Sequence, residues 1–87
     1  MTPAEMRAIV LEVLGAIAPE ADLASLTPDA RLRDQLDLDS MDFLNFVIAL
    51  HERFAVDIPE ADYARLATLA GCVDYLRSHT DGAPSAT

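Results

Sequence analysis

Apolar residues recur at helical spacing in three stretches of the chain, and these stretches predict its main helices. The segment Thr2-Pro3-Ala4-Glu5 has the cap, the first-turn proline and the capping-box acid of a helix start. A single apolar stripe follows over about residues 3–17, and Pro19 ends the helix. The stripe consists of Met6, Val10, Val13, Leu14 and Ile17.

The strongest helical pattern covers residues 39–54, where no Gly or Pro interrupts it and Asp39 is a good cap. One broad face is predicted to enter the core. It carries Phe43, Phe46, Val47, Leu50 and Phe54. A second apolar stripe, Met41, Leu44 and Ile48, lies between polar positions and is predicted to face water at least in part. Such a stripe indicates a partner, unless leucines of a neighbouring loop cover it.

Residues 18–38 have no sustained period and are predicted to form a long loop with a short helical turn near 30–33. The leucines expected to pin this loop to the core are Leu23, Leu26, Leu32 and Leu36. Beyond the central helix, Val56 and Ile58 are expected to point inward, and a short helix is predicted over Pro59–Leu66.

Thr68 is predicted to cap a last helix at about 69–78, with Tyr75 at the edge of the core and its hydroxyl near water. Its inward positions are Leu69, Cys72, Val73 and Leu76. The predicted fold is all-α, a small three-to-four-helix bundle with a long first loop. Residues 1–78 would be the domain and residues 79–87 a flexible tail.

Charge is concentrated in the middle of the chain. The net charge of −9 comes from 15 acids and 6 bases, and residues 34–62 hold eight of the acids but only one base, Arg53. This surface is predicted to repel nucleic acid and anionic membranes and to attract basic protein partners, although negative charge also keeps a small protein in solution. One cysteine excludes an internal disulfide, and no run has transmembrane length or signal-peptide character, so the cytoplasm is the expected location.

Ser40 stands at the start of the central helix between carboxylates, and four roles are conceivable for this stretch. As a catalytic nucleophile it lacks a base, because His51 lies about 16 Å along the same helix and His79 falls in the predicted tail. A calcium loop starting at Asp37 fails at its later positions, so no metal site is expected. The remaining roles are a simple part of the helix cap and a hydroxyl that another enzyme modifies.

The pattern Leu36-Asp37-Leu38-Asp39-Ser40-Met41-Asp42, followed by Phe54-x-Val56-x-Ile58-Pro59 and Thr68-Leu69, resembles the acyl carrier protein family over residues 3–78. The resemblance implies a freestanding, specialised carrier rather than an enzyme. A holo-acyl-carrier synthase would attach 4′-phosphopantetheine to Ser40, and the arm would hold acyl groups as thioesters. Alternatives are an unloaded, non-covalent interaction module with the same fold and a peptidyl or aminoacyl carrier.

The resemblance also implies surfaces and partners. Acyl-transfer, ligase or condensing enzymes with basic patches would dock on Asp39, Met41, Asp42, Leu44, Ile48 and Glu52. An acyl chain would be lined by Phe46, Leu50, Ile58 and Leu66. The carrier is expected to act as a monomer, without nucleic acid and without membrane insertion.

Three departures from the family pattern point to a dedicated pathway. Asp37 stands where the family usually has glycine, and Phe43 stands where it often has a small or polar residue. Asn45, His51 and Arg53 occupy positions that are commonly acidic in fatty-acid carriers.

Overall fold

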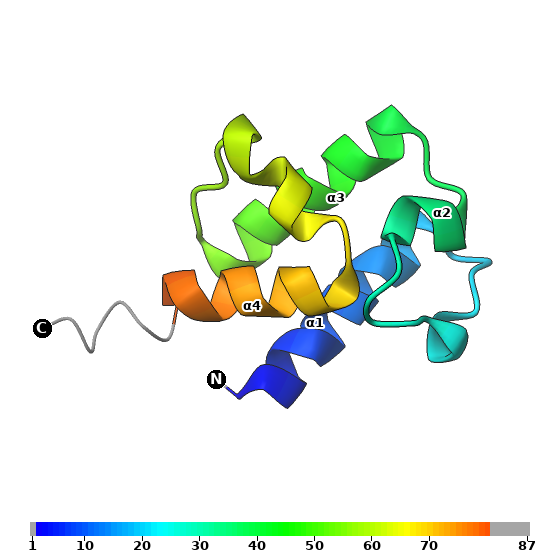
Figure 1. Cartoon of the computed structure of the whole chain (residues 1–87), viewed down its shortest axis with the longest axis horizontal. Coiled ribbons are helices and arrows are strands. Elements are labelled where there is room, and N and C mark those ends of the chain that lie inside the picture. The colour runs from blue at the N-terminus through cyan, green and yellow to red at the C-terminus, as the bar shows by residue number, and fades with distance from the viewer. Residues whose placement is uncertain (1, 81–87) are drawn as a thin grey trace, which may run out of the picture.

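The computed structural model describes residues 2–80 as a small helical bundle (Figure 1). Its α-helices are α1 (Pro3–Ile17), α2 (Leu32–Leu36), α3 (Ser40–Phe54) and α4 (Leu69–Thr80), and the 3₁₀ helices are η1 (Leu23–Ser25) and η2 (Glu60–Leu66). Residues 2–80 contain no strand, so the all-α prediction is confirmed. Within the same residues, none of the helices is both long and apolar enough to span a bilayer.

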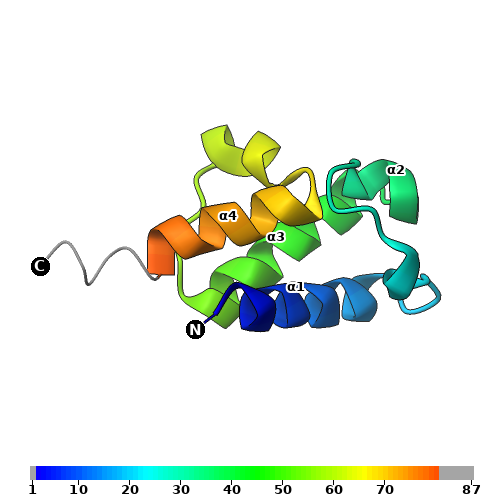
Figure 2. The ribbon, with the colours of Figure 1, turned by 60° about the horizontal axis from the view of Figure 1, so that its bottom comes forward.

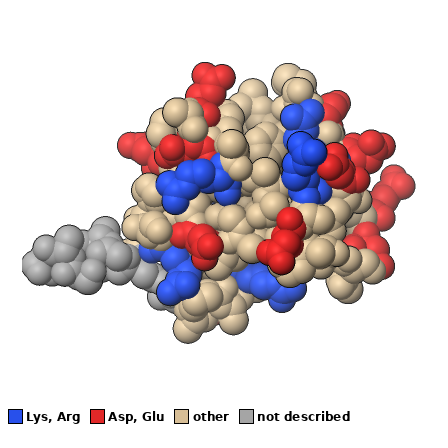
Figure 3. Space-filling model, viewed as in Figure 1, with Lys and Arg blue, Asp and Glu red and all other residues tan. Residues whose placement is uncertain are grey.

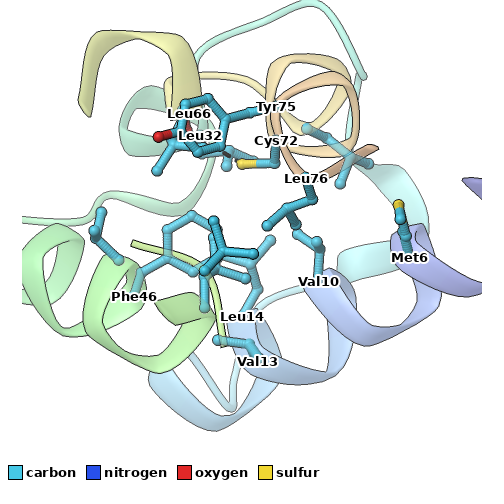
Figure 4. Close-up of a cluster of buried hydrophobic side chains, with 14 residues drawn as sticks. Met6, Val10, Val13, Leu14, Leu32, Phe46, Leu66, Cys72, Tyr75 and Leu76 are labelled. Atoms are coloured by element: carbon cyan, nitrogen blue, oxygen red, sulfur yellow. Dashed lines mark hydrogen bonds between the residues drawn. The ribbon is translucent and has the colours of Figure 1, made fainter. Parts of the chain in front are cut away.

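The helices α1, α3 and α4 pack together, α2 lies beside the start of α3, and η2 packs on α4 (Figure 2). Figure 4 shows Phe46 of α3, Leu14 of α1 and Leu76 of α4 pointing into a common centre. Burial of such side chains is the main favourable term in a fold of this size. The buried cluster is Met6, Val10, Val13, Leu14, Leu32, Phe46, Val47, Leu50, Val56, Leu66, Leu69, Cys72, Tyr75 and Leu76.

The predicted starts of α1 and α3 are confirmed, and both carry a capping box. In α1, Thr2 Oγ1 accepts a hydrogen bond from Glu5 N at 3.1 Å, and Glu5 Oε1 accepts one from Thr2 N at 2.7 Å. The bond from Thr2 N to the Glu5 carboxylate favours its charged form and lowers the pKa of Glu5 below its usual value. The helix ends at Ile17, two residues before Pro19.

The long connection between α1 and α3 packs down on the bundle. Its short helical turn, expected at 30–33, forms instead at Leu32–Leu36. Tertiary bonds fix that register, because Leu32 N donates to Ala67 O at 2.8 Å and Ala70 N donates to Pro28 O at 3.0 Å. Leu32 is fully buried, whereas the other three predicted anchors pack against the core with part of their surface exposed.

The prediction for Tyr75 was wrong. Its side chain is fully buried, and its hydroxyl donates to Asp62 Oδ2 at 2.8 Å. The arrangement arises because η2 folds back over α4, which brings Asp62 to the phenol and the Arg65 guanidinium over its ring at 4.8 Å. A polar partner of this kind is what allows a tyrosine hydroxyl to be buried.

Thr68 caps α4 as predicted, because its Oγ1 accepts from Gly71 N at 2.9 Å. The helix extends to Thr80, two residues beyond the predicted range, and so includes His79, which was expected in the tail. The His79 ring stacks on Tyr75 with centroids 4.1 Å apart, and its Nδ1 bonds to Tyr75 O at 2.8 Å. The rest of the predicted tail, residues 81–87, lies outside the described residues.

Candidate functional site

Ser40 is the first residue of α3, and its side chain is exposed. The capping of this helix is carried out by its neighbours, because Asp39 Oδ1 accepts from Asp42 N at 2.8 Å and Asp42 Oδ2 accepts from Asp39 N at 3.4 Å. The Asp39 cap was predicted, whereas the reciprocal bond from Asp42 was not. Since Asp39 and Asp42 complete the cap between them, the hydroxyl of Ser40 takes no part in it.

The first amides of α3 point toward the same region. No acceptor within residues 2–80 bonds to the N–H groups of Ser40 and Met41. Unpaired first-turn amides and the helix dipole favour an anion at this end of a helix, although the carboxylates of Asp39 and Asp42 oppose one. The local structure can therefore accept an anionic group on the Ser40 oxygen, at a cost set by those two acids.

The structure adds one residue that the sequence did not indicate. Arg33 of α2 places its Nη2 3.4 Å from Ser40 Oγ, within donating distance. The two residues are seven positions apart, and the chain reverses between them at Asp37. No regular helical spacing joins them, so the only available signal was the presence of a base at the edge of the acidic stretch.

Asp37 provides the turn that leads into the site. Its backbone is left-handed, with φ 54° and ψ 45°, at the C-terminus of α2. The turn closes because Leu38 N donates to Arg33 O at 3.1 Å. The expectation that aspartate supports this turn in place of glycine is met, since Asp tolerates the left-handed region better than most residues.

The second apolar stripe of α3 faces water. Met41, Leu44 and Ile48 are 64%, 36% and 44% exposed and are the large exposed hydrophobic residues of the described chain. The leucines of the loop therefore do not cover the stripe, and the prediction that it faces water is confirmed. Glu52 is exposed on the same helix, whereas Asp42 is half-buried in the cap.

Two of the arginines form ion pairs with acidic side chains. Arg53, which occupies a position that is commonly acidic in fatty-acid carriers, forms an ion pair with Glu12 of α1, with Nη1 and Oε1 2.5 Å apart. Arg31 pairs with Asp34 at 3.4 Å. Figure 3 shows Arg side chains lying beside Asp and Glu side chains over the end of the molecule formed by α2 and the start of α3. The acidic surface is therefore interrupted by arginines.

The groups that could supply a base or a thiol are engaged elsewhere. His51 Nδ1 bonds to Val56 O at 2.7 Å, at the end of α3 opposite Ser40. Cys72 is buried, its Sγ donates to Leu66 O at 3.3 Å, and burial raises the pKa of its thiol to about 12. Within residues 2–80, no three His, Cys, Asp or Glu side chains converge on a possible metal position.

The predicted acyl-lining residues separate into two groups. Phe46, Leu50 and Leu66 are fully buried in the packed core. Ile58 is partly buried and lies in a surface groove of about 570 Å³ that also includes Ile48 and Tyr63. Because Ile48 belongs to both, this groove is continuous with the exposed stripe of α3.

Comparison with known proteins gives consistent results at the level of family and fold. The family described as "Phosphopantetheine attachment site" matches residues 4–76. An acyl carrier protein of Lactobacillus johnsonii is 36% identical over 58 residues, which cover 67% of this chain and 72% of that protein. One from Rubrobacter xylanophilus is 33% identical over 58 residues, with the same coverage of 67% and 72%.

The structure of an acyl carrier protein from Enterococcus faecalis superposes with a TM-score of 0.67 at 28% identity, covering 85% of this chain and 98% of that one. The fold of this bundle therefore recurs in a solved structure.

Proposed function

The chain belongs to the acyl carrier protein family, and we infer from this that it carries acyl groups as thioesters on a covalent 4′-phosphopantetheine arm. Members of this family are carriers rather than catalysts, and they interact with enzymes of acyl transfer and synthesis. The arm supplies the reactive thiol, which the chain's single, buried cysteine does not provide.

The proposed attachment point is Ser40. The observation that carries this assignment is the division of roles at the start of α3, where Asp39 and Asp42 complete the helix cap and leave the exposed Ser40 hydroxyl outside it. The unpaired amides of Ser40 and Met41 suit the phosphodiester that would form on that oxygen. The arm would then leave from the end of the bundle into water.

The proposed docking surface is the exposed stripe Met41, Leu44 and Ile48, bordered by Asp39, Asp42 and Glu52. An apolar strip with an acidic rim favours partners that carry an apolar contact within a basic patch, since the rim steers approach and the strip supplies buried area. The holo-acyl-carrier synthase, acyl-transfer, ligase and condensing enzymes are the partners proposed for it.

A dedicated pathway is proposed rather than general fatty-acid synthesis. Asn45 and His51 are uncharged or weakly basic at exposed positions of α3, and the Glu12 carboxylate neutralises Arg53. The docking helix is therefore less acidic than in general fatty-acid carriers, although Arg53 does not turn it basic. Partners with a smaller or differently placed basic patch fit this charge pattern best.

The proposed acyl-lining residues imply that the bundle must open. Phe46, Leu50 and Leu66 have no exposed surface, so an acyl chain would contact them only by displacing packed side chains. Ile58 is already accessible from the groove beside Ile48. A short or polar cargo that stays in this groove would require less rearrangement than a long chain in the core.

Other features remain predictions. These are action as a monomer, a cytoplasmic location, the absence of any catalytic activity of the chain's own and a domain boundary near residue 78.

Loading in vitro tests the proposal. The purified apo-protein is incubated with coenzyme A, Mg²⁺ and a broad-specificity holo-synthase, and its intact mass is measured. We expect a gain of one phosphopantetheine in the wild type and in Ser25→Ala, whose serine lies in η1, and no gain in Ser40→Ala. An equal gain in Ser40→Ala, or no gain in the wild type with any synthase, would refute the assignment.

A further inference from the structure

The side chain of Arg33 is the positive group that the fold places beside Ser40. It comes from a different helix, reaches Ser40 Oγ from Nη2 at 3.4 Å and is exposed. The chain has only six bases, all of them arginine, against 15 acids, so most Asp and Glu side chains have no cationic neighbour. A base beside this particular oxygen therefore requires a physical reason.

Arg33 has no competing charge partner among the described residues. The ion pairs within residues 2–80 are Arg31 with Asp34 and Arg53 with Glu12, and the guanidinium of Arg33 has no carboxylate within 4 Å there. The nearby carboxylates of Asp39 and Asp42 are bonded to each other's backbone amides. Among the described residues, Arg33 therefore forms no ion pair, although it directly precedes the acidic stretch of residues 34–62.

We propose that Arg33 is a positioning residue for the prosthetic arm, whose phosphodiester it binds on the Ser40 oxygen; the inference rests on the proposed attachment at Ser40. A phosphodiester on Oγ places its two non-bridging oxygens close to that atom, on the side where Arg33 already donates. Guanidinium groups suit such oxygens because their planar fork donates two parallel hydrogen bonds. The anion thereby gains a cation that offsets Asp39 and Asp42.

This contact explains how an anionic arm is held at an acidic helix start. The helix dipole and the amides of Ser40 and Met41 supply part of the stabilisation, but two carboxylates lie in the same turn. Arg33 supplies the missing positive charge from outside the helix. It also limits rotation about the bond to Ser40 Oγ, so the arm leaves the protein in fewer directions.

Three variants separate this role from a structural one. Arg33→Gln removes the charge but keeps a good helix former, and Arg33→Lys keeps the charge without the planar fork. Arg31→Gln is the matched control, because it removes the same charge from the same segment at a residue that pairs with Asp34 instead. Each protein is prepared in apo and holo forms, and its loading is confirmed by intact mass.

Two readouts follow on the free holo-proteins: the ³¹P NMR position of the arm, and the change in melting temperature on loading. Loading should change the melting temperature of the wild type and of Arg31→Gln by about 2–4 °C more, in the stabilising direction, than it changes that of Arg33→Gln. We expect the ³¹P signal to move in Arg33→Gln, to stay in place in Arg31→Gln and to be restored in part by Arg33→Lys. A residue that merely supports α2 would alter the apo and holo forms equally and leave the ³¹P signal unchanged.

Coincident ³¹P positions and equal changes in melting temperature on loading for the wild type and Arg33→Gln would overturn the role of Arg33 while leaving attachment at Ser40 intact. Failure of the wild type to gain the arm would instead overturn the attachment, and this inference with it.

Discussion

Within residues 2–80, two non-glycine residues have left-handed backbones, and replacing them by glycine tests the turn that leads into the site. Asp37 ends α2 with φ 54° and ψ 45°, and Ala55 ends α3 with φ 54° and ψ 43°. The backbone geometry is nearly the same at both, so the side chain is the main difference between them. Asp37→Gly restores the residue that the family usually has three positions before the modified serine.

The magnitudes follow from the backbone. An ordinary L-residue in the left-handed region destabilises the folded state by about 1–2 kcal/mol. Glycine avoids that strain, but ordering its more flexible unfolded chain costs about 0.5–1 kcal/mol. Ala55→Gly should therefore raise the free energy of unfolding by about 0.5–1 kcal/mol. Asp37→Gly should raise it by less, about 0–0.5 kcal/mol, because aspartate is better tolerated there. Ala8→Gly, at an exposed interior position of α1, should lower it by about 1 kcal/mol.

Urea denaturation followed by circular dichroism measures these differences. With a slope of about 1 kcal/mol per M, the midpoint should rise by about 0.5–1 M in Ala55→Gly. Asp37→Asn serves as the charge control, since asparagine tolerates the same backbone. A fall in the midpoint for Ala55→Gly, or the same loss in Ala55→Gly as in Ala8→Gly, would refute the reasoning.

Three further predictions concern docking, the buried tyrosine and surface charge. Leu44→Asp should slow loading by a holo-synthase about tenfold at unchanged helicity, whereas Ala8→Asp, with the same added charge at an exposed position of α1, should not; unfolding of Leu44→Asp would contradict an exposed stripe. Burial and the bond to Asp62 raise the pKa of Tyr75 from 10.0 to about 12, so the stability of the wild type should fall between these pH values more steeply than that of Tyr75→Phe. At pH 7 the substitution should lower the free energy of unfolding by about 1 kcal/mol. Parallel profiles of stability against pH for the two proteins would contradict this. Added salt should raise the melting temperature by screening repulsion among the central acids, and a melting temperature insensitive to salt would argue against that repulsion.

The sequence predicts the long helices well and the short ones less well, for a physical reason. A 15-residue helix such as α1 or α3 repeats its apolar period several times and carries its own cap. The five residues of α2 are set by bonds to distant segments, such as that from Leu32 N to Ala67 O, which no local pattern encodes. Helical periodicity also predicts that Tyr75 points inward, but it does not predict how deeply the side chain is buried, because that depends on how much of the phenol η2 covers.

The candidate site likewise has local features, which the sequence predicts, and long-range contacts, which it does not. Ser40, its capping neighbour Asp39 and the exposed stripe are local features of one helix, and the sequence identifies them. The approach of Arg33 depends on the left-handed turn at Asp37, and the pairing of Arg53 with Glu12 joins residues 41 positions apart. Contacts of this kind depend on chain reversal and packing, so only the three-dimensional structure shows them.

The most direct test of the carrier assignment is the mass of one tryptic peptide from the protein purified from its native host. Cleavage after Arg33 and Arg53 releases residues 34–53, in which Ser40 is the only residue with a hydroxyl group. We predict that this peptide carries one phosphopantetheine, in part with an acyl group that hydroxylamine removes. An unmodified 34–53 peptide from active cells, or an arm found on another peptide, would contradict the account and would favour an unloaded interaction module or a different attachment site.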